Sequence, residues 1–111
     1  MKDLTNLKTY IIDSEDPHEV DDAISLEIKE GNKKHLWIHI SNPCKLFLHD
    51  SHVDLNARKR NSSLYLIDQY IPMLPSHIVE KANLEQNKIS ETISASIIFN
   101  ENGSIINISN I

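Results

Sequence analysis

A dense group of carboxylates near the N-terminus is the part of this sequence whose residue types point most directly to chemistry. Six acidic residues fall between positions 13 and 22, in the string Ile-Asp-Ser-Glu-Asp-Pro-His-Glu-Val-Asp-Asp-Ala of residues 12–23. Like charges this close repel, so a folded chain needs a positive charge to relieve them. A hard divalent cation held by oxygen ligands is the usual solution. Because a magnesium-type ion suits phosphoryl chemistry, this acidic group indicates phosphoryl transfer on nucleic acids or nucleotides.

The segments on either side of the acidic group are predicted to be strands. Residues 8–13 lead into it as a strand, and residues 23–29 alternate apolar and polar residues with the period of a half-buried strand. Asp13 ends the first strand and Asp21 and Asp22 begin the second, so the loop can present them together. Asp21 and Asp22 point in opposite directions if extended, so only one of them is expected to share a metal with Asp13. The alternative is a solvated acidic turn; an EF-hand is excluded because its ligand spacing is missing.

Two hairpins with short helices between them are predicted for the whole chain, which gives an α+β fold with an antiparallel or mixed sheet. Residues 35–41 alternate in the same way as residues 23–29, and Gly31 suits the turn that joins them. The second hairpin is predicted from residues 93–99 and 104–108, on either side of an Asn-Glu-Asn-Gly turn.

The predicted helices lie between the two hairpins. One covers residues 52–60, with Asp50 or Ser51 as its N-cap, and the other covers residues 76–82, with Ser76 as its N-cap. Two prolines make residues 71–75 an extended loop between them.

Composition limits the class of protein. The chain has 111 residues, 40% of them hydrophobic, so it forms one domain or a piece of one. The net charge of −5 argues against tight nonspecific binding of nucleic acid, although a bound cation would cancel part of the acidic group. Cys44 is the only cysteine, no apolar run is long enough to cross a membrane, and the first residues lack the apolar core of a secretory signal. We therefore expect a soluble, cytoplasmic protein without a membrane partner.

Four blocks of the sequence, in order, resemble the start of the RNB catalytic domain of the ribonuclease II / ribonuclease R family. They are the acidic string of residues 12–25, His-Ile-Ser-Asn-Pro at 39–43, residues 53–66, and Ile-Pro-Met-Leu-Pro at 71–75. Because the resemblance covers only the first part of the family's domain, residues 1–111 are expected to be its N-terminal portion. It implies a magnesium-dependent exoribonuclease, with manganese as a possible substitute, that degrades single-stranded RNA from the 3′ end to nucleoside monophosphates. DNA is not an expected partner.

The resemblance also assigns roles to single residues. The family's four catalytic acidic positions fall on Asp13, Glu19, Asp21 and Asp22. By analogy, Asp13 and Asp22 bind the metal directly, Glu19 supports the metal or its water, and Asp21 acts near the reacting 3′ nucleotide. Glu19 departs from the family, which usually has Asp there. His18 is a weak candidate for a general base, since a histidine in such a loop is more often simply solvated.

RNA contacts are expected outside the acidic loop. Tyr65 matches a family aromatic that stacks on a nucleotide near the 3′ end, and the alternative for it is a core tyrosine. Arg58 and Arg60 are candidates for phosphate contacts, and the alternative is a solvated helix end, where cations are favoured. Trp37 is expected to pack in the core.

Several features of the resemblance reduce the expected activity. Asn42 stands where the family usually has Asp, and Ser90 where it usually has Arg. The family's later catalytic arginine, its second stacking tyrosine and its cold-shock and S1 domains lie beyond the matched blocks. We therefore expect weak hydrolysis at most from this chain, with apolar sheet surface left exposed. The alternatives are a non-catalytic RNA- or protein-binding module of the same origin and a metal-binding domain that touches no nucleic acid.

Overall fold

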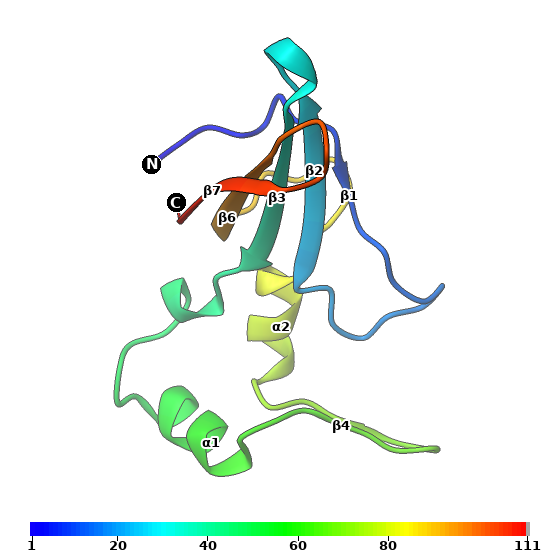
Figure 1. The fold of residues 1–111 in the computed structure, drawn as a ribbon. Helices are drawn as coiled ribbons and strands as arrows, with labels where there is room; N and C mark the ends of the chain where they lie inside the picture. The colour runs from blue at the N-terminus through cyan, green and yellow to red at the C-terminus, as the bar shows by residue number, and fades with distance from the viewer. Residues whose placement is uncertain (111) are drawn as a thin grey trace.

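An antiparallel sheet of five strands forms the larger part of the molecule (Figure 1). The computed structural model describes residues 1–110, and the strands stand in the order β1-β2-β3-β6-β7. Their bounds are Thr9–Tyr10 for β1, Asp22–Ile28 for β2, Lys34–Ser41 for β3, Thr92–Phe99 for β6 and Ile105–Asn110 for β7. The predicted α+β class, built from antiparallel hairpins, is confirmed.

Both predicted hairpin turns are present. Between β2 and β3 the chain makes a 3-10 turn, Glu30–Asn32, in which Gly31 has a φ angle of 70°. Between β6 and β7 the side-chain oxygen of Asn100 accepts hydrogen bonds from the backbone N–H groups of Asn102 and Ser104. Gly103 completes this turn with a φ angle of 81°, which glycine adopts without a Cβ clash.

The chain between β3 and β6 forms a smaller unit at one end of the sheet (Figure 1). It contains a 3-10 turn (Pro43–Lys45), helix α1 (His52–Arg60), a hairpin of β4 (Leu64–Tyr65) and β5 (Tyr70–Ile71), and helix α2 (Ser76–Ala82). Its buried centre is formed by Ala57 of α1, Ile78 of α2 and Leu74, which precedes α2. None of the helices within residues 1–110 is long and apolar enough to span a bilayer.

Helix α1 has the predicted bounds because both of its ends are capped locally. Ser51 occupies the N-cap, and its side chain accepts a hydrogen bond from the backbone N–H of Asp54. Asn61 ends the helix in the left-handed conformation, with a φ angle of 66°.

Three details differ from the sequence predictions. Strand β1 covers Thr9–Tyr10 and not residues 8–13, because only these two residues pair with β2. Ser76 is the first residue of α2 and not its cap; Pro75 holds the N-cap position, without a side-chain hydrogen bond. Residues 71–75 are not wholly a loop, since Ile71 pairs with Leu64 in the β4–β5 hairpin.

The buried face of the sheet is its polar face. Its inward side chains come from β2, β3 and β6 and are Ala23, Ser25, His35, Trp37, His39, Ser41, Ser94 and Ser96. The opposite face carries the isoleucines and leucines, and much of it is open: Leu26 is 54% exposed and Ile93 57%. Strand alternation thus identifies which residues share a face, but the face with the higher hydrophobicity is not the one covered.

Hydrogen bonds across three strands explain how polar residues are tolerated inside. The Ser25 hydroxyl contacts His39 Nε2 at 2.8 Å, and His39 Nδ1 contacts the Ser94 hydroxyl at 2.8 Å. Both imidazole nitrogens are therefore satisfied, which removes most of the cost of burial. Trp37 is 1% exposed and donates its indole N–H to Glu27, so the expectation that it packs in the core is confirmed.

Candidate functional site

The acidic loop between β1 and β2 is fixed to the end of helix α2. The Val20 N–H donates to the side-chain oxygen of Asn83 at 3.1 Å, and the Val20 carbonyl accepts from the Leu84 N–H at 2.9 Å. The Asn83 side chain also donates to the His18 carbonyl. Val20 packs with Ala23 and Leu84 in a small buried cluster. One half of the loop is thus held by tertiary contacts that local sequence does not reveal.

Glu19 joins this loop to the β4–β5 hairpin. One oxygen of its carboxylate, Oε1, accepts hydrogen bonds from the Ser63 hydroxyl, at 2.6 Å, and from the Tyr70 hydroxyl. The Ser63 oxygen in turn accepts the Met73 N–H at 2.9 Å. Burial raises the pKa of Glu19, but the hydrogen bonds from Ser63 and Tyr70 outweigh it and lower the pKa overall. Glu19 is therefore held as a carboxylate by neutral hydroxyl donors.

Tyr65 of the β4–β5 hairpin is influenced by the negative charges of Glu19 and two other residues of the acidic loop. It stands opposite Tyr70 in the hairpin, their ring centroids are 5.2 Å apart, and 60% of Tyr65 is exposed. Burial raises the pKa of Tyr65, and the negative charges of Glu19, Asp21 and Asp13 raise it further. Three of the four predicted acidic residues are therefore close enough to Tyr65 for their charges to act on its hydroxyl.

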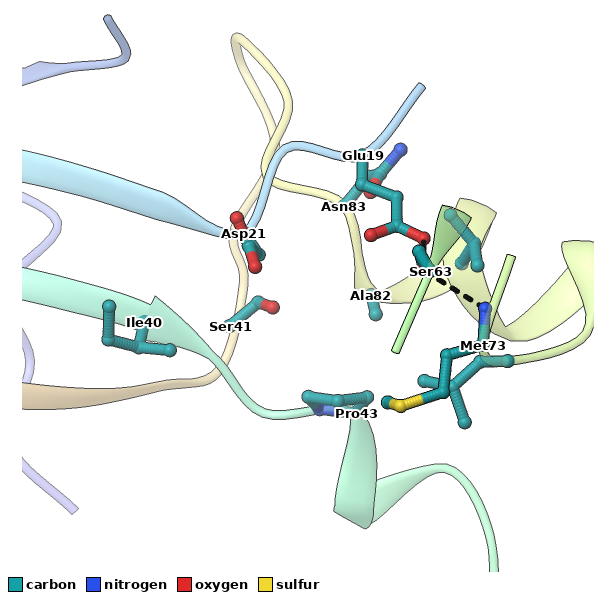
Figure 2. A pocket seen from close by; sticks show the side chains of 11 residues that line it. Glu19, Asp21, Ile40, Ser41, Pro43, Ser63, Met73, Ala82 and Asn83 are labelled. Carbon is teal, nitrogen blue, oxygen red and sulfur yellow. Dashed lines mark hydrogen bonds between the residues drawn. The ribbon is translucent and has the colours of Figure 1, made fainter. Parts of the chain in front are cut away.

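A cavity of about 310 Å³ opens between the acidic loop and the segment that follows β5. Figure 2 shows Glu19 and Asp21 on one side of it and Pro43 and Met73 on the other. Carboxylates at the edge of a mainly apolar cavity are typical of sites that orient a ligand by a few polar groups.

The predicted metal ligands are available but not gathered. Asp13, Asp21 and Asp22 are exposed, and the one hydrogen bond to an Asp13 side-chain oxygen within residues 1–110 comes from the N–H of Ser14. Within residues 1–110, none of the six loop carboxylates has a Lys, Arg or His nitrogen within 4.0 Å. In the same part of the chain, no three of them bring ligand atoms within 4.8 Å of one another. Uncompensated oxygen donors fit a hard divalent ion, which would have to draw them together.

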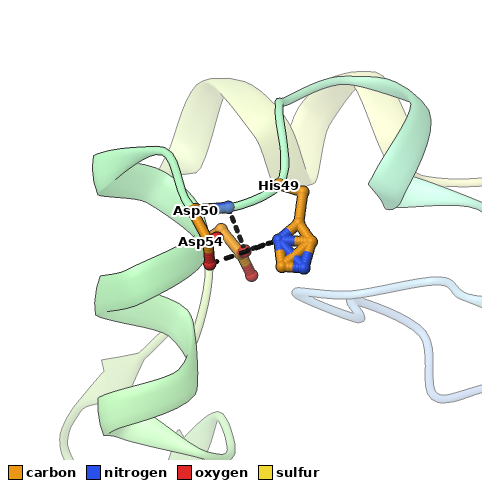
Figure 3. Close-up of side chains that lie close together, drawn as sticks. All are labelled: His49, Asp50 and Asp54. Carbon is orange, nitrogen blue, oxygen red and sulfur yellow. Dashed lines mark hydrogen bonds and ion pairs between the residues drawn. The ribbon is translucent and has the colours of Figure 1, made fainter.

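The predicted basic contacts are already engaged. Arg58 pairs with Asp54 at 2.6 Å and with Asp50 at 3.1 Å, and Arg60 donates to the Pro72 carbonyl at 2.8 Å. Figure 3 shows that His49, Asp50 and Asp54 lie close together, and their ligand atoms are within 4.8 Å. Because Arg58 neutralises both aspartates, this cluster is an ion-pair network at the start of α1.

Ser63, Tyr70 and Asn83 are site residues that the sequence analysis missed. Each acts on the loop from 44 or more positions along the chain. The only local signal was a pair of short apolar-aromatic segments, Leu64-Tyr65 and Tyr70-Ile71, on either side of four residues without glycine or proline.

Comparison with known proteins shows the family. The family model described as "RNB domain" matches residues 1–110, and the chain belongs to the RNB domain family. It is 38% identical to an uncharacterized ribonuclease of Synechocystis, across 93% of this chain and 16% of that protein. It is 34% identical to a chloroplastic/mitochondrial ribonuclease II of Arabidopsis thaliana, across 93% of this chain and 13% of that protein. The chain thus spans about a sixth of the first relative and about an eighth of the second.

Solved structures share the fold. Mycoplasma genitalium RNase R in complex with double-stranded RNA superimposes with a TM-score of 0.91 at 23% identity, over 98% of this chain and 20% of that one. Yeast Ssd1, described as a pseudonuclease, gives a TM-score of 0.87 at 20% identity, over 98% of this chain and 14% of that one. Because a ribonuclease and a pseudonuclease share this fold, the fold alone does not decide whether a protein that has it hydrolyses RNA.

Proposed function

We propose that this chain supplies the acidic part of an RNB-type exoribonuclease site, which hydrolyses single-stranded RNA from the 3′ end and releases nucleoside monophosphates. The observation that supports it most is the junction at Glu19. Its carboxylate binds the hairpin that presents Tyr65, so the acidic loop and the stacking tyrosine are held as one unit. An RNA end stacked on Tyr65 would have its phosphates beside the loop carboxylates.

In this proposal the four acidic residues have two roles, which are binding of the metal ion and contact with the reacting nucleotide. Asp13 and Asp22 hold Mg²⁺, or Mn²⁺ in its place, and Asp21 faces the reacting 3′ nucleotide beside the cavity. Glu19 supports the metal through its Oε2, since Oε1 already accepts two hydroxyls. The bound ion would polarise the phosphate and lower the pKa of a water.

RNA binding in this proposal depends on stacking more than on charge. Tyr65 offers an exposed ring, whereas Arg58 and Arg60 reach phosphates only with the guanidinium donors that their protein contacts leave free. With a net charge of −5 on the chain, hydrolysis by these residues alone is weak.

A non-catalytic RNA- or protein-binding module is the second candidate. Two observations favour it: the loop carboxylates within residues 1–110 are not gathered around a point, and Glu19 is occupied by hydroxyl donors. Under this alternative, Asp13 and Asp22 can be changed to asparagine without loss of RNA binding, and binding persists in a chelator.

Incubation with labelled single-stranded RNA separates the two candidates. A 5′ label stays on the shortening product, so attack from the 3′ end gives a ladder of decreasing length and no free label. The proposal predicts slow shortening with Mg²⁺ and none with a chelator or in Asp22→Asn. Asp16→Asn, prepared identically, removes the same charge from the same loop and should keep the activity. Binding without any shortening, unchanged in Asp22→Asn, supports the binding module.

A further inference from the structure

A second cavity lies beside the β4–β5 hairpin and is lined by Tyr70 but not by Tyr65, the predicted stacking residue. It has a volume of about 180 Å³, with His18 and Tyr70 along one wall and Ser76, Val79 and Glu80 of helix α2 along another. This volume is below the roughly 300–1,000 Å³ of pockets that enclose a drug-sized ligand, so the cavity suits a single planar ring system.

The aromatic wall of the cavity is already stacked. The rings of His18 and Tyr70 have centroids 4.2 Å apart and planes only 12° from parallel. Tyr65 continues the group at 5.2 Å from Tyr70. Hydrogen bonds hold the Tyr70 ring and the backbone of His18, because Glu19 accepts the Tyr70 hydroxyl and Asn83 donates to the His18 backbone carbonyl. A further flat ring can join the stack at a reduced cost of ordering, because the Tyr70 ring is already held in place.

Among the described residues, the opposite wall offers one unpartnered carboxylate, which accepts, and one unpartnered hydroxyl, which can donate or accept. Within residues 1–110, neither the Glu80 carboxylate nor the Ser76 hydroxyl has a hydrogen-bond or ion-pair partner, whereas the Asn83 amide is used in holding the loop. A carboxylate accepts from the exocyclic amino group of cytosine and from N–H donors of guanine. Uracil offers a single ring N–H, and the two carbonyl oxygens that flank it repel a carboxylate that approaches it. Glu80 therefore attracts amino-bearing bases and repels the carbonyl edge of uracil.

We propose that this cavity is a nucleobase pocket for single-stranded RNA, in which a base stacks on the His18–Tyr70 pair and Glu80 selects bases that carry an amino group. The proposal rests on the proposed function only in assuming that the chain binds RNA. It adds a second stacking position beside Tyr65 and a preference for cytosine over uracil.

Fluorescence anisotropy with two labelled oligonucleotides of equal length, one of cytidine only and one of uridine only, tests the pocket. The 111-residue chain is titrated at neutral pH, low salt and with a chelator, so that hydrolysis does not interfere. Wild type should bind the cytidine strand at least about fivefold more tightly than the uridine strand. His18→Ala should weaken that binding by about fivefold or more, since stacking contributes roughly 1–3 kcal/mol per base.

Glu80→Gln is the specificity test, and Glu85→Gln is its matched control. Both changes remove one exposed carboxylate from the same region, but Glu80 lines the cavity, whereas Glu85 does not line it and pairs with Lys88 at 3.7 Å. Glu80→Gln should reduce the preference for cytidine to about twofold or less, whereas Glu85→Gln should leave it unchanged. If both variants bind both oligonucleotides more tightly by the same factor, the effect comes from net charge alone, and the proposal of a base-selective pocket is refuted.

The outcomes also separate this proposal from the function it rests on. If wild type binds neither strand, the proposed RNA function fails and the pocket fails with it. If wild type binds both strands equally and Tyr65→Ala abolishes binding while His18→Ala does not, the RNA function stands and the pocket is refuted.

Discussion

The Tyr70 hydroxyl is the most informative single group to remove, because Tyr70→Phe keeps the ring that stacks on His18 and deletes only the donor to Glu19. Hydrogen bonds to a charged partner contribute about 1.5–3 kcal/mol to stability. Both side chains are only half-buried, so water competes for the carboxylate. We therefore expect Tyr70→Phe to lower the free energy of unfolding by about 1–1.5 kcal/mol.

Urea unfolding followed by the fluorescence of Trp37 measures this change. Trp37 is the only tryptophan and is 1% exposed, so its emission reports loss of the whole sheet. With a denaturant slope near the low end of about 1–3 kcal/mol/M, the midpoint should fall by about 1 M. Tyr10→Phe is the control: Tyr10 is 50% exposed, and the change should stay within about 0.5 kcal/mol.

A double-mutant cycle decides whether Glu19 is the partner that matters. In a Glu19→Ala background the Tyr70 hydroxyl has lost its acceptor, so Tyr70→Phe should cost little, and the coupling free energy should be about 1 kcal/mol. If Tyr70→Phe costs the same with and without Glu19, the junction between loop and hairpin contributes nothing, and the argument that they form one unit is refuted.

Three further predictions concern the sheet, the loop and helix α1. Burial lowers the folded-state pKa of His39 below its value of about 6.5 in the unfolded chain. As the pH falls, His39 is therefore protonated in the unfolded chain before it is protonated in the folded chain. Stability should be fully present above about pH 6.5 and fall as the pH drops below it, and urea midpoints measured across this range should be flatter in His39→Gln. Isothermal titration with Mg²⁺ should give heat with wild type and with Asp16→Asn but not with Asp22→Asn; equal heat in all three proteins would refute the assigned ligand. Ser51→Ala should lower the free energy of unfolding by about 0.5–1 kcal/mol through loss of the N-cap, whereas Ser62→Ala, at an exposed position without a side-chain hydrogen bond among the described residues, should not.

The elements that sequence predicted well are those whose ends are set locally. Helix α1 was bounded correctly because Ser51 and Asn61 satisfy its terminal backbone groups within a few residues. The β2–β3 and β6–β7 hairpins followed from Gly31 and Gly103, whose φ angles of 70° and 81° few other residues adopt.

The parts that sequence missed depend on contacts between distant residues. The β4–β5 hairpin has strands of two residues each, too short for alternation to be visible. Alternation with a period of two fixes which residues share a face and not which face is covered, although exposed apolar sheet surface was expected and is observed. On the buried face, His39 contacts the hydroxyls of Ser25 and Ser94 on two neighbouring strands, which satisfies polar groups that would otherwise be costly to bury.

The sequence points to the acidic loop as the candidate site, and that assignment stays a prediction; the contacts that hold the loop were not visible from the sequence. The acidic string itself marked the loop, whereas Ser63, Tyr70 and Asn83 carry no motif of their own. The role given to Glu19 stays a prediction, and its hydrogen bonds to Ser63 and Tyr70 add a physical reason for the extra methylene. A longer side chain can reach the hairpin, which an aspartate at the same backbone position would approach less closely.

The two acidic clusters of this chain show why geometry alone is a poor guide to a metal site. His49, Asp50 and Asp54 already lie within 4.8 Å of one another, yet Arg58 balances their charge, so an incoming ion would have to displace a guanidinium. The acidic loop is more dispersed, but its anchors are neutral: hydroxyls for Glu19 and amides for the backbone of residues 18–20. Neutral anchors fix the loop without cancelling its charge. The electrostatic free energy that a divalent ion can recover is therefore larger at the loop, and it is greatest where unpaired carboxylates can still move toward the ion.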